Sequence, residues 1–91
     1  MSLLQTMAIK IIQEQELVIG PLAWDEASKV KGLKLQNHSG VAIEGDEKEV
    51  VNLLVKQYSR LFGHASEEVC KDAVKDIIFE LPADKVPSAL R

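Results

Sequence analysis

The clearest pattern of apolar and polar positions lies in the second half of the chain. Apolar residues recur there every three or four positions in two runs separated by Gly63. Such spacing places apolar side chains along one side of an α-helix. The first helix, 46–62, has Asp46 as its N-cap, and the second, 66–81, has Ser66 in that position. Because their connection is short, we expect the two helices to pack as an antiparallel αα-hairpin.

Two further helices are predicted before this hairpin. Apolar residues at helical spacing indicate a helix over residues 3–18, which Gly20 and Pro21 would end. Its apolar surface is wide, so we expect it to be buried on more than one side. Pro21 suits the first turn of a second helix, which ends at Gly32.

Between the second and third helices the period of the pattern changes to two. Leu33 and Leu35 alternate with polar residues, as Val41 and Ile43 do with Ala42 and Glu44, which is typical of an antiparallel β-hairpin near residues 33–44. The four apolar side chains share one face if Leu35 lies opposite Val41. The same register places Leu33 opposite Ile43.

This register implies an odd-numbered loop centred on His38, for example three residues with Gly40 in a bulge. A lone two-stranded hairpin is only marginally stable, so its apolar face is expected to pack against the helices. Its edges remain free unless another chain covers them.

The predicted fold is therefore mainly α (α+β), with element order ααββαα. A chain of 91 residues is expected to form a single compact helical domain, over residues 1–81. Residues 82–91 contain two prolines and small residues, and are predicted to be a loosely ordered tail that docks through Val86 and Leu90.

The amino-acid composition excludes or disfavours several classes of protein. The net charge is −3, with 14 acidic and 11 basic residues interspersed, which makes nucleic acid an unfavourable partner. One cysteine allows no internal disulfide and fits a reducing compartment. No apolar stretch reaches the ~20 residues of a membrane-spanning helix, and no signal-peptide pattern is visible. We expect a soluble, cytoplasmic protein.

Reactive side chains are few. His38, His64 and Cys70 show none of the familiar zinc spacings, and the chain has no glycine-rich phosphate loop. Cys70 is expected to fill the core and the two histidines to lie on the surface. We therefore predict no catalytic residue, cofactor or metal site, and no small-molecule ligand. The alternative is a small thiol-dependent enzyme that uses Cys70 with His64 or Tyr58.

Two charged clusters have ordinary explanations. Helix capping and favourable interaction with the helix dipole account for four acids that lie close together, Glu44, Asp46, Glu47 and Glu49. A solvated helix end accounts for three lysines that otherwise suggest a small anion site, Lys29, Lys31 and Lys34.

The wide apolar surfaces of so short a chain, and the lack of converging polar groups, predict a non-enzymatic protein–protein interaction or regulatory module. We expect it to form a homo-oligomer or to bind a protein partner. Six apolar residues are the candidate contacts: Trp24, Leu33, Leu35, Val41, Ile43 and Phe79. Trp24 is in phase with Ala27 and Val30, so core packing is favoured over a partner contact for this residue. A DNA-binding regulator with a helix-turn-helix-like unit over residues 46–81 is the second functional hypothesis.

Overall fold

The chain forms helices and strands in the predicted order in a computed structural model that describes residues 2–37 and 40–91. The described elements are α1 (Leu3–Ile19), α2 (Leu22–Ala27), β1 (Leu33–Asn37), β2 (Gly40–Ile43), α3 (Glu47–Phe62) and α4 (His64–Val74). Three 3₁₀ turns follow them: η1 (Ile78–Glu80), η2 (Ala83–Lys85) and η3 (Ser88–Leu90). The mainly helical α+β class, with its two-stranded antiparallel hairpin, is confirmed.

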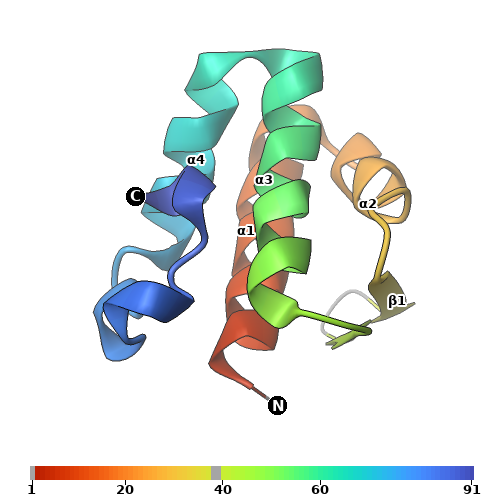
Figure 1. Cartoon of the computed structure of the whole chain (residues 1–91). Coiled ribbons are helices and arrows are strands. Elements are labelled where there is room, and N and C mark those ends of the chain that lie inside the picture. The colour runs from red at the N-terminus through yellow and green to blue at the C-terminus, as the bar shows by residue number, and fades with distance from the viewer. Residues whose placement is uncertain (1, 38–39) are drawn as a thin grey trace.

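Helix α1 is the centre of the packing. It contacts α2, α3, α4 and strand β2, and Figure 1 shows it behind α3, with α4 and α2 on opposite sides. Met7, Ile11 and Ile12 are completely buried, as its wide apolar surface requires. No helix in the described part of the chain is long and apolar enough to cross a membrane.

Side chains cap the first turns of both long helices. Asp46 caps α3 as predicted, because its Oδ1 accepts a hydrogen bond of 3.2 Å from the Glu49 backbone N–H. Ser2 and Gln5 form a reciprocal capping box at α1, with distances of 3.1 Å and 2.7 Å. The sequence carries the Ser-x-x-Gln signature of this motif, which the hydrophobic pattern alone does not show.

The β-hairpin has the predicted register. Leu33 pairs with Ile43 and Leu35 with Val41. The predicted bulge at Gly40 is wrong, because Gly40 pairs with Asn37 and the irregularity lies in β1, between Leu35 and Asn37. An extra residue in β1 preserves the shared apolar face as well as one in β2 would, so the pattern could not distinguish them. The loop residues 38 and 39 lie outside the described residues.

Helix α4 is shorter than the predicted 66–81. It begins at His64 after Gly63, and Ser66 lies within its first turn, where its hydroxyl donates to the Gly63 carbonyl at 2.8 Å. The α-helix ends at Val74, and i→i+3 hydrogen bonds carry the chain into η1. Two consecutive β-branched residues, Ile77 and Ile78, favour the helix less and contact the core from this tighter turn.

The C-terminal segment, predicted as a loosely ordered tail, instead packs against α3 and α4 through η3. Leu90 and Pro87 are buried. The Asn52 side-chain oxygen on α3 accepts hydrogen bonds from the Ala89 backbone N–H at 2.8 Å and the Ser88 hydroxyl at 3.2 Å. The predicted docking through Leu90 is therefore present, and a buried asparagine fixes it.

Candidate interaction surface

The six predicted contact residues lie in different environments. Trp24, Leu33 and Val41 are buried, with 6%, 3% and 4% of their surface exposed. Leu35 and Ile43 are partly buried against the core, whereas Phe79 in η1 is 77% exposed. The hairpin face and Trp24 are thus used inside a single chain, and Phe79 is the predicted contact that a partner could reach most readily.

A different set of large apolar side chains is exposed at the ends of the helices. Leu17 and Val18 lie near the end of α1, Leu22 begins α2, and Leu61 and Phe62 end α3. Between 37% and 81% of their surfaces are exposed. Figure 1 shows that α1 and α3 end, and α2 begins, at the same end of the bundle. We call these five residues the apolar end.

The length of α3 explains the exposure of its last two residues. Leu61 and Phe62 lie one heptad after Leu54 and Val55, so they continue the stripe that forms the core. Leu54 and Val55 are fully buried, but the chain turns back at Gly63 and leaves the last turn of α3 less covered. On α1 the helix face matters, because Leu17 is in phase with the exposed Lys10 and Glu14, whereas Ile19, the last residue of α1, packs against the core. An apolar stripe that continues to the last residue of a helix, as in α3, is the feature of the sequence that indicates this exposed surface.

Cys70 lies inside the bundle. It is buried, and Gln15 on α1 donates from its side-chain nitrogen to the Cys70 Sγ at 3.3 Å and to the Ser66 carbonyl at 3.0 Å. Burial raises the pKa of the Cys70 thiol to about 11, and the charge of Glu67 acts in the same direction, although the Gln15 hydrogen bond opposes it. The thiol is therefore protonated near neutral pH.

Among the described residues, Tyr58 and His64 do not form an open site with Cys70. The Tyr58 hydroxyl is buried and donates to the Ala23 carbonyl at 2.6 Å, and burial raises its pKa well above the usual value. His64 is exposed, and its ring nitrogens lie 3.2 Å and 3.7 Å from carboxylate oxygens of Glu67 and Glu68. His38 lies outside the described residues. In residues 2–37 and 40–91, no group of three metal-ligating side chains is close enough to hold an ion.

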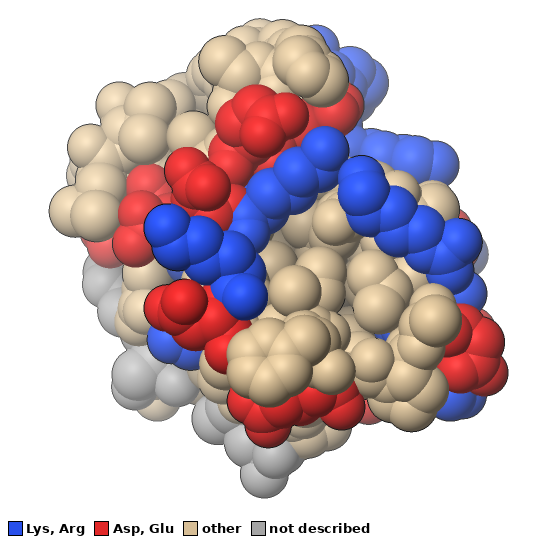
Figure 2. Space-filling view, turned by 90° about the vertical axis from the view of Figure 1, so that its left-hand side faces the viewer, with Lys and Arg blue, Asp and Glu red and all other residues tan. Residues whose placement is uncertain are grey.

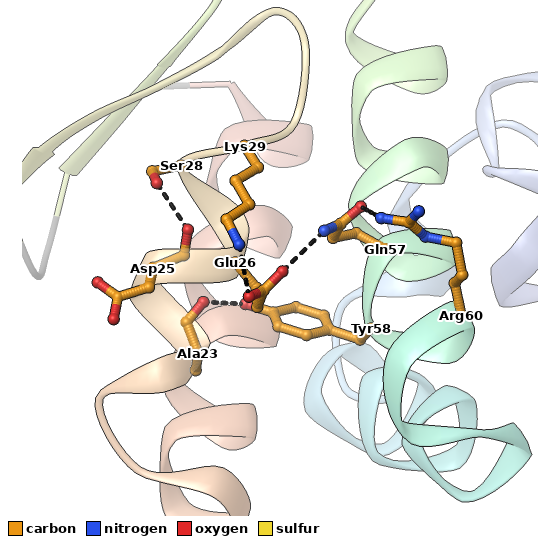
Figure 3. Close-up of polar contacts among 8 residues, drawn as sticks. All are labelled: Ala23, Asp25, Glu26, Ser28, Lys29, Gln57, Tyr58 and Arg60. Atoms are coloured by element: carbon orange, nitrogen blue, oxygen red, sulfur yellow. Dashed lines mark hydrogen bonds and ion pairs between the residues drawn. The ribbon is translucent and has the colours of Figure 1, made fainter.

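A buried carboxylate links α2 to α3. Glu26 accepts hydrogen bonds from the Lys29 ammonium at 2.9 Å and from the Gln57 side-chain amide at 2.8 Å (Figure 3). Arg60 donates to the Gln57 oxygen at 2.9 Å and extends the chain of contacts. The hydrogen bond from Lys29, followed by the one from Gln57, holds the pKa of Glu26 below its usual value. The network orients side chains of both elements beside the Tyr58 contact.

Three of the four clustered acids form side-chain contacts within the chain. Asp46 caps α3, and Glu47 accepts a hydrogen bond of 2.8 Å from the Ser2 hydroxyl at the start of α1. Glu44 lies 3.9 Å from Lys34 on the neighbouring strand. These contacts connect the hairpin, α3 and the N-terminus.

The exposed face of α4 carries charges of both signs. Acidic and basic side chains are interspersed over the side of the molecule formed by α4 and the C-terminal segment, as Figure 2 shows. Glu68, Asp72 and Asp76 are exposed on or just after α4. Carboxylates in these positions would repel nucleic acid phosphates.

Comparisons with known proteins give no assignment. No family model matches the chain, and neither a curated protein nor a solved structure matches it. The geometry of the chain's own residues is therefore the basis for a function.

Proposed function

We propose that the chain is a non-enzymatic protein-interaction module of the cytoplasm that self-associates through the apolar end. The observation that carries the proposal is that five large apolar side chains are exposed near helix ends that lie at one end of the bundle: Leu17, Val18, Leu22, Leu61 and Phe62. Exposed apolar patches mark protein contacts in soluble proteins, which supports a contact at this end.

A second copy of the chain is the partner that fits this surface best. In a two-fold symmetric contact each patch meets its own copy, so the patch must complement itself. The five residues are all apolar, and apolar surfaces satisfy that condition, whereas a patch of one charge would repel its copy. A 91-residue chain also buries a smaller fraction of its surface than a larger domain does, so association adds apolar burial that the fold alone lacks.

Sedimentation velocity at micromolar concentration tests this function. We expect a mass above the 10.1 kDa of one chain, and a dissociation constant raised at least about tenfold by Leu61→Glu, since the substitution places a charge in an apolar contact. Phe79→Glu is the matched control, because Phe79 is equally apolar and more exposed but lies outside the apolar end. Circular dichroism would verify that both variants fold.

Two results would contradict the proposal. One is a strictly monomeric mass for the unmodified chain. The other is dissociation by Phe79→Glu with no effect of Leu61→Glu, which would transfer the contact to η1.

The alternatives receive less support from the described residues. A DNA-binding role for α3 and α4 would bring Glu68, Asp72 and Asp76 towards phosphates. A thiol enzyme would need Cys70 to be accessible and ionised, and burial opposes both.

A further inference from the structure

A hollow beside α3 combines an apolar lining with a cationic rim. It lies between α3 and the turn that follows α2, and its volume is about 280 Å³. Its lining residues, which we call the basic groove, are Lys29, Val30, Lys31, Leu53, Lys56, Gln57 and Arg60. Four of them are cationic and none is acidic. The sequence pattern suggested an anion site at Lys29, Lys31 and Lys34. The fold places Lys29 and Lys31 here with Lys56 and Arg60 from α3, whereas Lys34 lines the adjoining hollow.

Much of this positive charge is not neutralised within the chain. Lys29 pairs with Glu26 at 2.9 Å, and Arg60 donates to the uncharged Gln57. Lys31 and Lys56 are exposed and form no ion pair with any described residue. The groove is therefore a local positive surface on a chain whose net charge is −3.

The charge changes sign where the groove continues towards the hairpin. An adjoining hollow of about 510 Å³ shares Lys31 and Leu53 with the basic groove. Its lining includes three acids, Glu44, Asp46 and Glu49, which outnumber its two lysines, Lys31 and Lys34. A long polyanion that left the basic groove in this direction would meet these carboxylates. A short anionic segment would not, so the arrangement favours a peptide over a nucleic acid strand.

We propose that the basic groove binds a short acidic segment of a partner protein, which places an apolar side chain against Val30 and Leu53. The carboxylates of the segment would form charge-assisted hydrogen bonds with Lys31, Lys56 and Arg60. Apolar contact with the lining would provide the specificity that charge alone lacks. This surface is distinct from the apolar end, so the inference holds whether or not the chain self-associates.

Fluorescence anisotropy with a labelled peptide of about twelve residues, composed of Glu and Leu with the leucines at helical spacing, tests the inference. We expect saturable binding that weakens as salt is raised from about 0.05 to about 0.5 M, because the contacts are electrostatic at an exposed site. Lys56→Glu should weaken binding at least about tenfold by reversing a charge in the groove. Lys75→Glu is the matched control, since Lys75 is also exposed but follows α4, away from the groove.

Two further probes separate the apolar contribution to binding from the electrostatic one. A peptide in which serine replaces leucine should bind several-fold more weakly, and single-stranded DNA of about twelve nucleotides should bind more weakly than the Glu–Leu peptide. Absence of binding, equal losses for Lys56→Glu and Lys75→Glu, equal affinity for the serine peptide, or tighter binding of the DNA would each overturn the inference. A monomeric mass would contradict the proposed self-association but not the binding of an acidic peptide. The two proposals can therefore fail independently.

Discussion

At the scale of single residues, Gly32 shows how tightly the start of the hairpin is packed. Its φ angle is +89°, and a Cβ added there would lie 2.8 Å from both the Glu44 carbonyl oxygen and a methyl carbon of Val50. The Gly32 carbonyl also accepts a hydrogen bond of 2.8 Å from the Glu44 backbone N–H. A side chain at this position would therefore disturb the junction between the turn after α2, the hairpin and α3.

We expect Gly32→Ala to lower the free energy of unfolding by about 2 kcal/mol or more, from backbone strain and the clash with backbone together. Gly45→Ala is the control, because Gly45 has a φ of +88° but no atom near the added Cβ. Gly45→Ala should lower the free energy of unfolding by about 1 kcal/mol, because it introduces backbone strain without a clash. Urea unfolding of both variants measures the difference, and equal costs would refute the close approach at Gly32.

Cys70 gives a second prediction at this scale. Its thiol has a pKa of about 11 in the folded chain, so only a small fraction is thiolate at pH 8. We expect a disulfide reagent at pH 8 to react at least about a hundredfold more slowly with the native chain than with the urea-unfolded chain, because burial adds to the loss of thiolate. A native rate close to the unfolded rate would contradict the burial and revive the thiol-enzyme hypothesis.

At the scale of secondary structure, the contact between α2 and α3 depends on the ionised form of Glu26. Its pKa in the folded chain lies below the usual 4.5, because Lys29 and Gln57 bind the carboxylate. Its contribution to stability is therefore complete above the unfolded pKa and is lost as the pH falls through the lower folded pKa. Glu67 follows the same rule, since the hydroxyl of Ser59 donates to it.

We expect the free energy of unfolding to fall between about pH 6 and about pH 3, and Glu26→Gln to make that fall smaller. The measurement is urea unfolding at both pH values. A pH dependence that is identical in Glu26→Gln and the unmodified chain would show that the α2–α3 network contributes no titrating group.

The sequence predicts elements well where their own pattern determines them. The hairpin register agrees with period two, because pairing Leu33 with Ile43 and Leu35 with Val41 places all four side chains on one face, whereas a one-residue slip would turn one strand over. The Asp46 cap of α3 was also predictable, because it depends only on residues next to it in the sequence. The C-terminal limit of α4 was not, because apolar residues keep helical spacing up to Leu81, whereas the α-helix ends at Val74 and a 3₁₀ turn follows.

At the scale of the whole molecule, the packing of the helices determines which apolar side chains remain exposed for the proposed self-association. The sequence identifies Leu61 and Trp24 alike as members of apolar stripes. The phase of Trp24 with Ala27 and Val30 already favoured its burial, whereas only the fold shows that Leu61, in the last turn of α3, is 46% exposed. The basic groove likewise joins lysines far apart in the chain, such as Lys31 and Lys56, which no local pattern connects.

Backbone amide NMR spectra over a dilution series test the central claim most directly. If the apolar end joins two copies, concentration-dependent shifts should centre on residues 16–22 and 60–64, where α1 and α3 end and α2 begins. The rest of the chain should change little. Spectra that do not change between millimolar and low micromolar concentration, or shifts centred on the hairpin or on residues 75–81, would contradict the account.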